Sequence, residues 1–193
     1  MTLPSDISRF LAPLVALQYL IDHFDHQGMI IGGIAASLLG RPRLTADLDA
    51  VILLSLERIP ELIEQAAKMG MEPRIPNLAD FARKSRVVLF RHRETGIDVD
   101  ISLGILPFET EAVERSQVYK AENIEIRLPT PEDLIILKGV AHRLRDIQDI
   151  EAICAAHPNL DWKRIELWLQ EFAAVLERPE IWRDIVAIKN RKV

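Results

Sequence analysis

Apolar residues recur at two different spacings along the chain, and the change of spacing divides it into regions. From Ile7 to Phe24 they recur every three or four residues, which is the spacing of one face of a helix. Short apolar runs follow, some continuous and some alternating, which are typical of strands. From Thr130 onward the helical spacing returns and persists. The pattern therefore predicts an α/β region with a leading helix and a helical region behind it.

Glycine, proline and capping residues indicate where the expected elements end. Gly40 and Gly70 follow periodic runs and end helices, while Thr130 is an N-cap with Pro131 at the first helical position. Pro13 is expected to kink or divide the leading helix. The expected strands are 29–31, 48–54, 86–92, 96–103, 118–119 and 124–128. The expected helices are one from a cap at Ser5–Asp6 to about residue 25, then 34–39, 59–69, 77–84, 130–145, 147–156, 161–176 and a short final one.

This order of elements predicts an α+β protein, in which a mixed sheet flanked by helices precedes a C-terminal helical region. The expected domains are 1–128 and 129–193. A chain of 193 residues is long enough to bury a core, and 49% hydrophobic and 27% charged residues are ordinary for a globular protein. The net charge of -5 argues against a protein whose main task is to hold nucleic acid by charge.

The sequence lacks the features expected of a membrane or secreted protein. No apolar run approaches the roughly 20 residues of a membrane helix. The single cysteine, Cys154, has no partner for an internal disulfide, and the first residues lack a basic start and a cleavage pattern. We therefore expect a cytoplasmic protein without a membrane partner. Its oligomeric state is not indicated.

Two aspartates separated by one residue stand where the strand 48–54 begins. Alternate side chains of a strand share a face, so Asp47 and Asp49 point the same way. Like charges this close repel each other unless a cation lies between them. Mg²⁺ fits because it prefers hard carboxylate oxygens and also binds phosphates. The pair therefore indicates metal-dependent phosphate chemistry.

A second aspartate pair with the same spacing lies on the expected strand 96–103. Asp98 and Asp100 share one face, and the apolar residues between and beside them occupy the other. If the two strands are neighbours, at least one carboxylate of the second pair can join the first pair at the metal. On this reasoning either of the two is a candidate.

A paired glycine, Gly32–Gly33, forms the turn between the expected strand 29–31 and the helix 34–39. Glycine lets the backbone approach a phosphate chain, and a helix N-terminus favours anions. With the aspartates, the turn predicts a site in which metal bridges the phosphates of a nucleoside triphosphate. A third aspartate there would accept the proton of an acceptor hydroxyl or lower its pKa.

Three motifs together resemble a known superfamily: Gly32–Gly33, then Arg43-x-Thr45-x-Asp47-Leu48-Asp49, then Val99-Asp100-Ile101. They resemble the nucleotidyltransferases with a DNA polymerase β-type palm, and among these the small bacterial enzymes of the abortive-infection type IV toxin group. The segment from Lys138 to Asp149 is similar to Lys and Arg/Asp elements of that toxin group. The resemblance covers residues 28 to about 153. Gly33 stands where the family often has Ser, and the strand pattern favours Asp100 as the third carboxylate.

The resemblance implies a polymerase β-like palm and Mg²⁺-dependent transfer of a nucleoside monophosphate from a nucleoside triphosphate, ATP among the candidates. The acceptor would be a hydroxyl of RNA, a protein or a small molecule, and a toxin–antitoxin pair is a possible setting. It implies catalytic and metal-binding roles, with two Mg²⁺ ions, for Asp47, Asp49 and Asp100. It implies nucleotide-binding roles for Gly32, Gly33, Arg43, Thr45 and Lys138.

Each of these residues also has a simpler interpretation. Arg43 and Thr45 would contact phosphates or hold the Asp47 strand in register, whereas in the simpler interpretation Arg43 is a surface partner of an acidic side chain. Lys138 would bind triphosphate, whereas in the simpler interpretation it is a solvated charge on a helix. The basic cluster of Arg83, Lys84, Arg86, Arg91 and Arg93 contacts an acceptor or is a solvated edge. For the whole chain, the alternative is a non-catalytic module of the same fold that binds a nucleotide or a protein partner.

Overall fold

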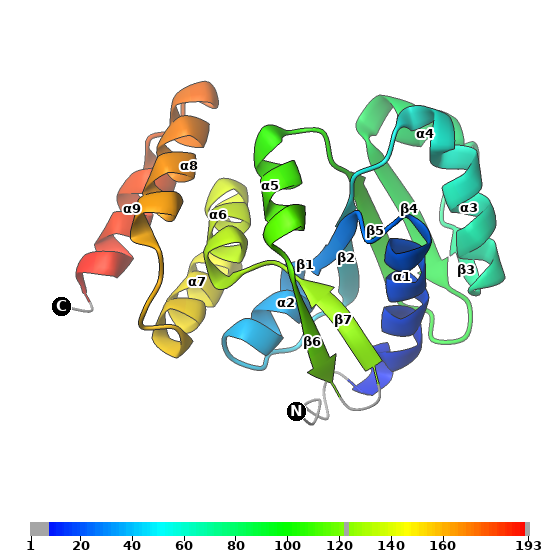
Figure 1. Cartoon of the computed structure of the whole chain (residues 1–193), viewed down its shortest axis with the longest axis horizontal. Helices are drawn as coiled ribbons and strands as arrows, with labels where there is room; N and C mark the ends of the chain where they lie inside the picture. The colour runs from blue at the N-terminus through cyan, green and yellow to red at the C-terminus, as the bar shows by residue number, and fades with distance from the viewer. Residues whose placement is uncertain (1–7, 122–123, 192–193) are drawn as a thin grey trace. The chain divides into compact units, whose positions relative to one another are not determined.

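The computed structural model describes residues 8–121 and 124–191 (Figure 1). Its helices are η1 (Ser8–Phe10), α1 (Leu11–His23), α2 (Gly32–Leu39), η2 (Leu56–Arg58), α3 (Ile59–Lys68), α4 (Leu78–Ser85), α5 (Pro107–Arg115), α6 (Pro131–Ala141), α7 (Leu144–Ala156), α8 (Trp162–Val175) and α9 (Glu180–Asn190). Its strands are β1 (Gly28–Ile31), β2 (Asp47–Ile52), β3 (Met71–Pro73), β4 (Val87–His92), β5 (Asp98–Leu103), β6 (Gln117–Ala121) and β7 (Ile124–Leu128).

Five strands form one mixed sheet in the order β1-β2-β5-β4-β3. The central pair β2 and β5 is parallel, and every other neighbouring pair in this sheet is antiparallel. Strands β6 and β7 form a separate antiparallel hairpin. The expected α+β class, with a mixed sheet flanked by helices, is confirmed.

The chain divides into two compact units. The first contains the sheet and spans residues up to Ile34 and from Arg43 to Pro129, while the second contains Ala35–Pro42 and everything from Thr130. Helix α2 therefore begins in the first unit and continues in the second. The domain boundary expected from the sequence, 128/129, stays a prediction.

One face of the sheet in the first unit is buried and the other is partly open. In β4, β5 and the first half of β2, buried residues alternate with more exposed ones, as in Leu48 and Asp49 or Val99 and Asp100. Helix α1 covers the buried face, because a Cβ placed on Gly28 would meet Ile21 of α1 and Ile52 of that face. The alternation thus leaves the aspartates on the face opposite α1.

The second unit is helical. Helices α8 and α9 pack side by side, and α6 contacts both α7 and α8 (Figure 1). Gly139 of α6 allows close packing on α8, because a Cβ there would lie 2.7 Å from a methyl group of Leu169. The core is filled by aliphatic side chains, among them Leu134, Ile135, Ile150, Ile165, Leu169, Ile181 and Ile185.

Four features differ from the sequence predictions. Strand β3 and helix α5 were not expected. The helix predicted for 130–145 ends at Ala141, because His142 adopts a left-handed conformation (φ 53°) and Arg143 is extended. Pro13 neither kinks nor divides α1; it is the third residue of that helix, where its missing N–H has no intrahelical partner to lose. The cap expected at Ser5–Asp6 lies outside the described residues.

No helix within residues 8–121 and 124–191 has both the length and the apolar character needed to cross a membrane.

Candidate active site

The register of the two parallel strands brings four carboxylates onto one face of the sheet. Asp47 pairs with Asp98, and Asp49 with Asp100. Residues directly paired in a sheet point to the same side, and neighbouring strands lie roughly 4.8 Å apart. All four side chains are partly exposed, and the residue that follows each of them in its strand is buried. The sequence expectation that β5 adds carboxylates to the β2 pair therefore matches the sheet topology.

The backbone of Gly32 lies directly against Asp49. Gly32 has a φ of +67°, and a Cβ at this position would lie 2.7 Å from the carboxylate carbon of Asp49. Both properties require glycine, the first for its backbone conformation and the second for space. The glycine turn and the first aspartate pair are thus parts of one site in the first unit.

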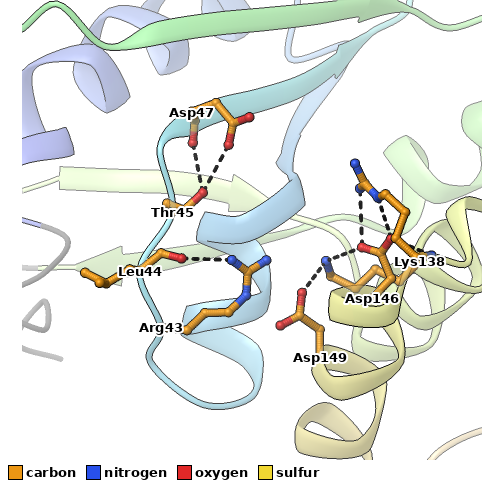
Figure 2. A network of polar contacts seen from close by, with 8 residues as sticks. Arg43, Leu44, Thr45, Asp47, Lys138, Asp146 and Asp149 are labelled. Carbon is orange, nitrogen blue, oxygen red and sulfur yellow. Dashed lines mark hydrogen bonds and ion pairs between the residues drawn. The ribbon is translucent and has the colours of Figure 1, made fainter.

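The loop before β2 fills the space beside Gly33. A Cβ on Gly33 would lie 2.5 Å from the Thr45 hydroxyl oxygen, and that hydroxyl donates to Asp47 Oδ1 over 3.1 Å (Figure 2). Arg43 donates to the carbonyl of Leu44, and its guanidinium lies 3.4 Å from the Gly33 Cβ position. The Thr45 hydroxyl therefore occupies the place that the side chain of a serine would take at this position of the turn.

A cation not identified from the sequence lies on the second aspartate pair. Arg74, which follows β3, donates from Nη1 to Asp98 Oδ2 and from Nη2 to Asp100 Oδ1, each over 2.6 Å. Arg91 of β4 donates from Nε to the other oxygen of Asp98 over 2.7 Å. Asp98 is therefore bonded through both oxygens. Asp100 accepts through Oδ1 alone, among the contacts of the described residues.

The two aspartates of β5 have opposite electrostatic environments. The hydrogen bond from Arg91 is the main cause that lowers the pKa of Asp98. Burial opposes it, but Arg74 lowers the pKa further, so that it stays below its ordinary value. Burial raises the pKa of Asp100 although Arg74 opposes it, and the negative charges of Asp47 and Asp98 add to the rise. Asp98 is thus a fixed anion, and Asp100 is the member of the pair with the greater affinity for a proton.

The part of the chain that the structure describes contains no group of three or more His, Cys, Asp or Glu side chains in an arrangement that would hold a metal ion. The carboxylates of β5 face Arg74. The donor set still suits a hard cation, since it consists of carboxylate oxygens on neighbouring strands, and those of β5 already bind the positive charges of Arg74 and Arg91.

Seven of the eight predicted site residues belong to the first unit, and the contacts above join six of them around Gly32–Gly33 and β2; Asp100 is the strand partner of Asp49. Lys138 belongs to the second unit. Its ammonium bonds there to Asp149 over 2.7 Å and to Asp146 over 3.4 Å (Figure 2). All three side chains are at most 5% exposed. The role of Lys138 in triphosphate binding stays a prediction, and its contacts within this unit are structural.

Lys138→Met is expected to destabilise the protein by about 3–5 kcal/mol, because two buried carboxylates would lose their shared cation. Urea unfolding of the full chain measures this, with Lys163→Met on the exposed side of α8 as the control that stays near wild type. Equal stability of both variants would show that the buried pair stabilises nothing.

The stabilisation from Asp146 is expected to depend on pH. Burial alone would raise the pKa of Asp146, but the hydrogen bond from Arg143 and the charge of Lys138 lower it. The contribution of Asp146 to the free energy of unfolding is therefore fully present above its ordinary pKa of 3.8 and is lost as the pH falls through the lowered pKa.

A family model that covers most of the chain assigns it to the nucleotidyltransferase class. A family model described as "Nucleotidyltransferase of unknown function (DUF6036)" matches residues 13–191, and the chain belongs to this family. No curated protein matches the chain by sequence.

Solved structures with a similar fold include a nucleotidyltransferase-like protein and an antibiotic-resistance factor. An antigenic nucleotidyltransferase-like protein from Paracoccidioides brasiliensis has a TM-score of 0.56 at 17% identity, over 97% of this chain and 95% of its own. The antibiotic-resistance factor ANT(2'')-Ia has a TM-score of 0.54 at 17% identity, over 88% and 94%. The lincosamide adenylyltransferase LnuA has a TM-score of 0.48 at 16% identity, over 74% and 96%. At these identities the first two show the shared fold.

Proposed function

We propose that this protein is a Mg²⁺-dependent nucleotidyltransferase, which moves a nucleoside monophosphate from a nucleoside triphosphate to an acceptor hydroxyl. The observation that carries the proposal is the in-register pairing of Asp47–Asp49 with Asp98–Asp100, on a partly open face beside a glycine turn. Clustered carboxylates on an open face repel each other and are stabilised by a cation. The family and fold described above support the same reaction class.

In this proposal Asp47 and Asp49 hold the metal, and Asp100 completes the site. Asp100 is favoured over Asp98 because Asp98 is bonded through both oxygens to arginines, whereas Asp100 is bonded through one. One or two Mg²⁺ ions, when bound, would neutralise the charge that develops on the transferring phosphoryl group. The raised pKa of Asp100 suits a carboxylate that accepts the proton of the attacking hydroxyl.

The triphosphate is proposed to lie on Gly32 and Gly33, where the backbone can approach it at the start of α2. Thr45 and Arg43 border the same turn and supply a hydroxyl donor and a guanidinium. Phosphoryl transfer depends on positioning and charge neutralisation more than on covalent help from the protein. These groups would therefore suffice together with the metal.

The finer parts of the proposal concern the nucleotide, the acceptor and the biological setting. ATP is the first nucleotide to test, since the resemblance of the motifs places it among the candidate nucleotides. A role in a cytoplasmic toxin–antitoxin pair rests on the resemblance of the motifs alone. An RNA or protein acceptor would favour that setting over modification of a small molecule.

Calorimetry with nucleotides tests the proposal. Mg·ATP or Mg·CTP is expected to bind the wild-type protein, and binding is expected to weaken strongly when EDTA removes the metal. Incubation with α-labelled nucleotides and RNA, protein and small-molecule acceptors should then yield a labelled product. Binding without any product would favour the non-catalytic nucleotide-binding module. Absence of both binding and labelling would overturn the proposed function.

A further inference from the structure

A hollow lies beside the carboxylates on the same face of the sheet. It has a volume of about 530 Å³ and is lined from β3, β4 and β5, by residues that include Glu72, Arg74, Leu89, Arg91 and Asp98. The register confirms that these share one face, because Arg91 pairs with both Asp98 and Glu72, and Leu89 pairs with Asp100. A hollow of this size suits a small molecule.

The order of strands places this hollow opposite the glycine turn. Across the face, the end of β1 with Gly32 comes first, then the aspartates of β2, then those of β5, and then the hollow over β4 and β3. In phosphoryl transfer the attacking and leaving oxygens lie roughly in line on opposite sides of the phosphorus. If the pyrophosphate leaves on the side of Gly32, the attacking hydroxyl enters from the side of the hollow.

The donors that face the hollow are arginines held in place by Asp98. The Nε atom of Arg91 is bonded to Asp98, and its two terminal nitrogens make no hydrogen bond among the described residues. The Arg91 side chain is 58% exposed, so these donors are open to a ligand. The charge of Glu72 is already matched by Arg93, which donates to it over 2.6 Å. An anchored guanidinium with free terminal nitrogens is suited to bind a phosphate or carboxylate through two parallel hydrogen bonds.

We propose that this hollow is the acceptor site, and that Arg91 binds an anionic group, phosphate or carboxylate, on the acceptor that carries the reacting hydroxyl. The proposal rests on the proposed function for the location of the triphosphate. Arg74 is a positioning residue, because it joins Asp98 to Asp100 and so couples the acceptor side to the third carboxylate. If Asp100 bound a metal instead of Arg74, Asp98 alone would balance the charges of Arg74 and Arg91, and the hollow would gain positive charge.

Binding of small probes tests the acceptor site without a need for turnover. Ribose 5-phosphate and gluconate supply hydroxyls with a phosphate or a carboxylate, ribose is the neutral control, and glucosamine is the cationic one. Calorimetry is performed with and without Mg²⁺ and α,β-methylene-ATP. We expect one of the anionic probes to bind at least about tenfold more tightly than ribose, and more tightly still with the metal and nucleotide present.

Arg91→Gln is expected to weaken binding of the anionic probe by about tenfold or more, and Arg91→Lys, which keeps the charge without the fork, to weaken it less. Arg83→Gln is the matched control, because Arg83 is 46% exposed and pairs with Asp80 on α4, outside the hollow. Thermal unfolding checks that each variant is folded. Binding of Mg²⁺ with α,β-methylene-ATP should be equal in all of them.

Two results would overturn the acceptor site: anionic probes that bind no more tightly than ribose, or probe binding that Arg91→Gln leaves unchanged. If Mg²⁺ and α,β-methylene-ATP still bind the wild type in either case, the acceptor inference fails alone. If they do not bind, the proposed function fails on its own measurement.

Discussion

Asp49→Asn is expected to reduce nucleotidyl transfer by at least about a thousandfold, as measured by label transferred from an α-labelled nucleoside triphosphate. The substitution preserves shape but removes the charge of the carboxylate that lies against Gly32 and pairs with Asp100 in the sheet. Metal affinity should fall with activity, because an amide is a weaker ligand for Mg²⁺ than a carboxylate. Asp80→Asn is the matched control, since Asp80 is 72% exposed on α4 and should transfer label as the wild type does.

The same assay separates the two aspartates of β5. Asp100→Asn is expected to match the loss in Asp49→Asn, whereas Asp98→Asn should retain more activity, because Asp98 acts through Arg74 and Arg91. A variant Asp49→Asn with activity within tenfold of the wild type would contradict a metal-binding role. Loss in Asp98→Asn alone would reverse the assignment of the third carboxylate.

Gly32→Ala is expected to lower both stability and transfer, and Gly96→Ala separates the two causes. Both glycines have nearly the same positive φ, +67° and +68°, so alanine carries about 1–2 kcal/mol of backbone strain at either position. A Cβ on Gly96 meets nothing within 4 Å, whereas a Cβ on Gly32 collides with the side chain of Asp49. Only the second substitution displaces a proposed metal ligand, and a displacement of about 1 Å can cost about a hundredfold in rate.

Urea unfolding and label transfer together measure this difference. Both variants should lose a similar amount of stability from strain, and Gly32→Ala should lose more because Asp49 must move. Transfer should fall about a hundredfold in Gly32→Ala and stay near wild type in Gly96→Ala. Equal activity of the two variants would show that the contact between Gly32 and Asp49 has no part in the reaction.

Sequence reasoning found the parts of the site that are encoded within a few residues. The alternation in Asp47-Leu48-Asp49 and Asp98-Val99-Asp100 states directly that each pair shares a face, and the structure places the two strands as neighbours. The glycine turn was recognisable because paired glycines between a strand and a helix need no distant contact to be interpreted. The α+β class followed from the same local signals.

The arginine on the second aspartate pair was not predictable in the same way. Arg74 lies 24 and 26 residues before its two partners and follows a three-residue strand that contains Pro73. A segment this short has no periodicity, and only the complete sheet shows that it pairs with β4. Likewise, Lys138 was predicted from a motif as a nucleotide ligand, but the motif did not reveal that Asp146 and Asp149 enclose its ammonium.

The equal register of β2 and β5 also limits how this chain can misfold. A shift of one residue in either strand would turn its aspartates onto the face covered by α1 and would bring apolar side chains such as Leu48 or Val99 onto the partly open face. Burying unpaired carboxylates costs several kcal/mol each even when they take up protons, and the total stability of a small protein is only about 5–15 kcal/mol. Correct strand pairing and assembly of the carboxylates are therefore one event. A mutational scan should find that insertions or deletions of one residue in these strands remove the folded protein altogether and leave no folded but inactive form.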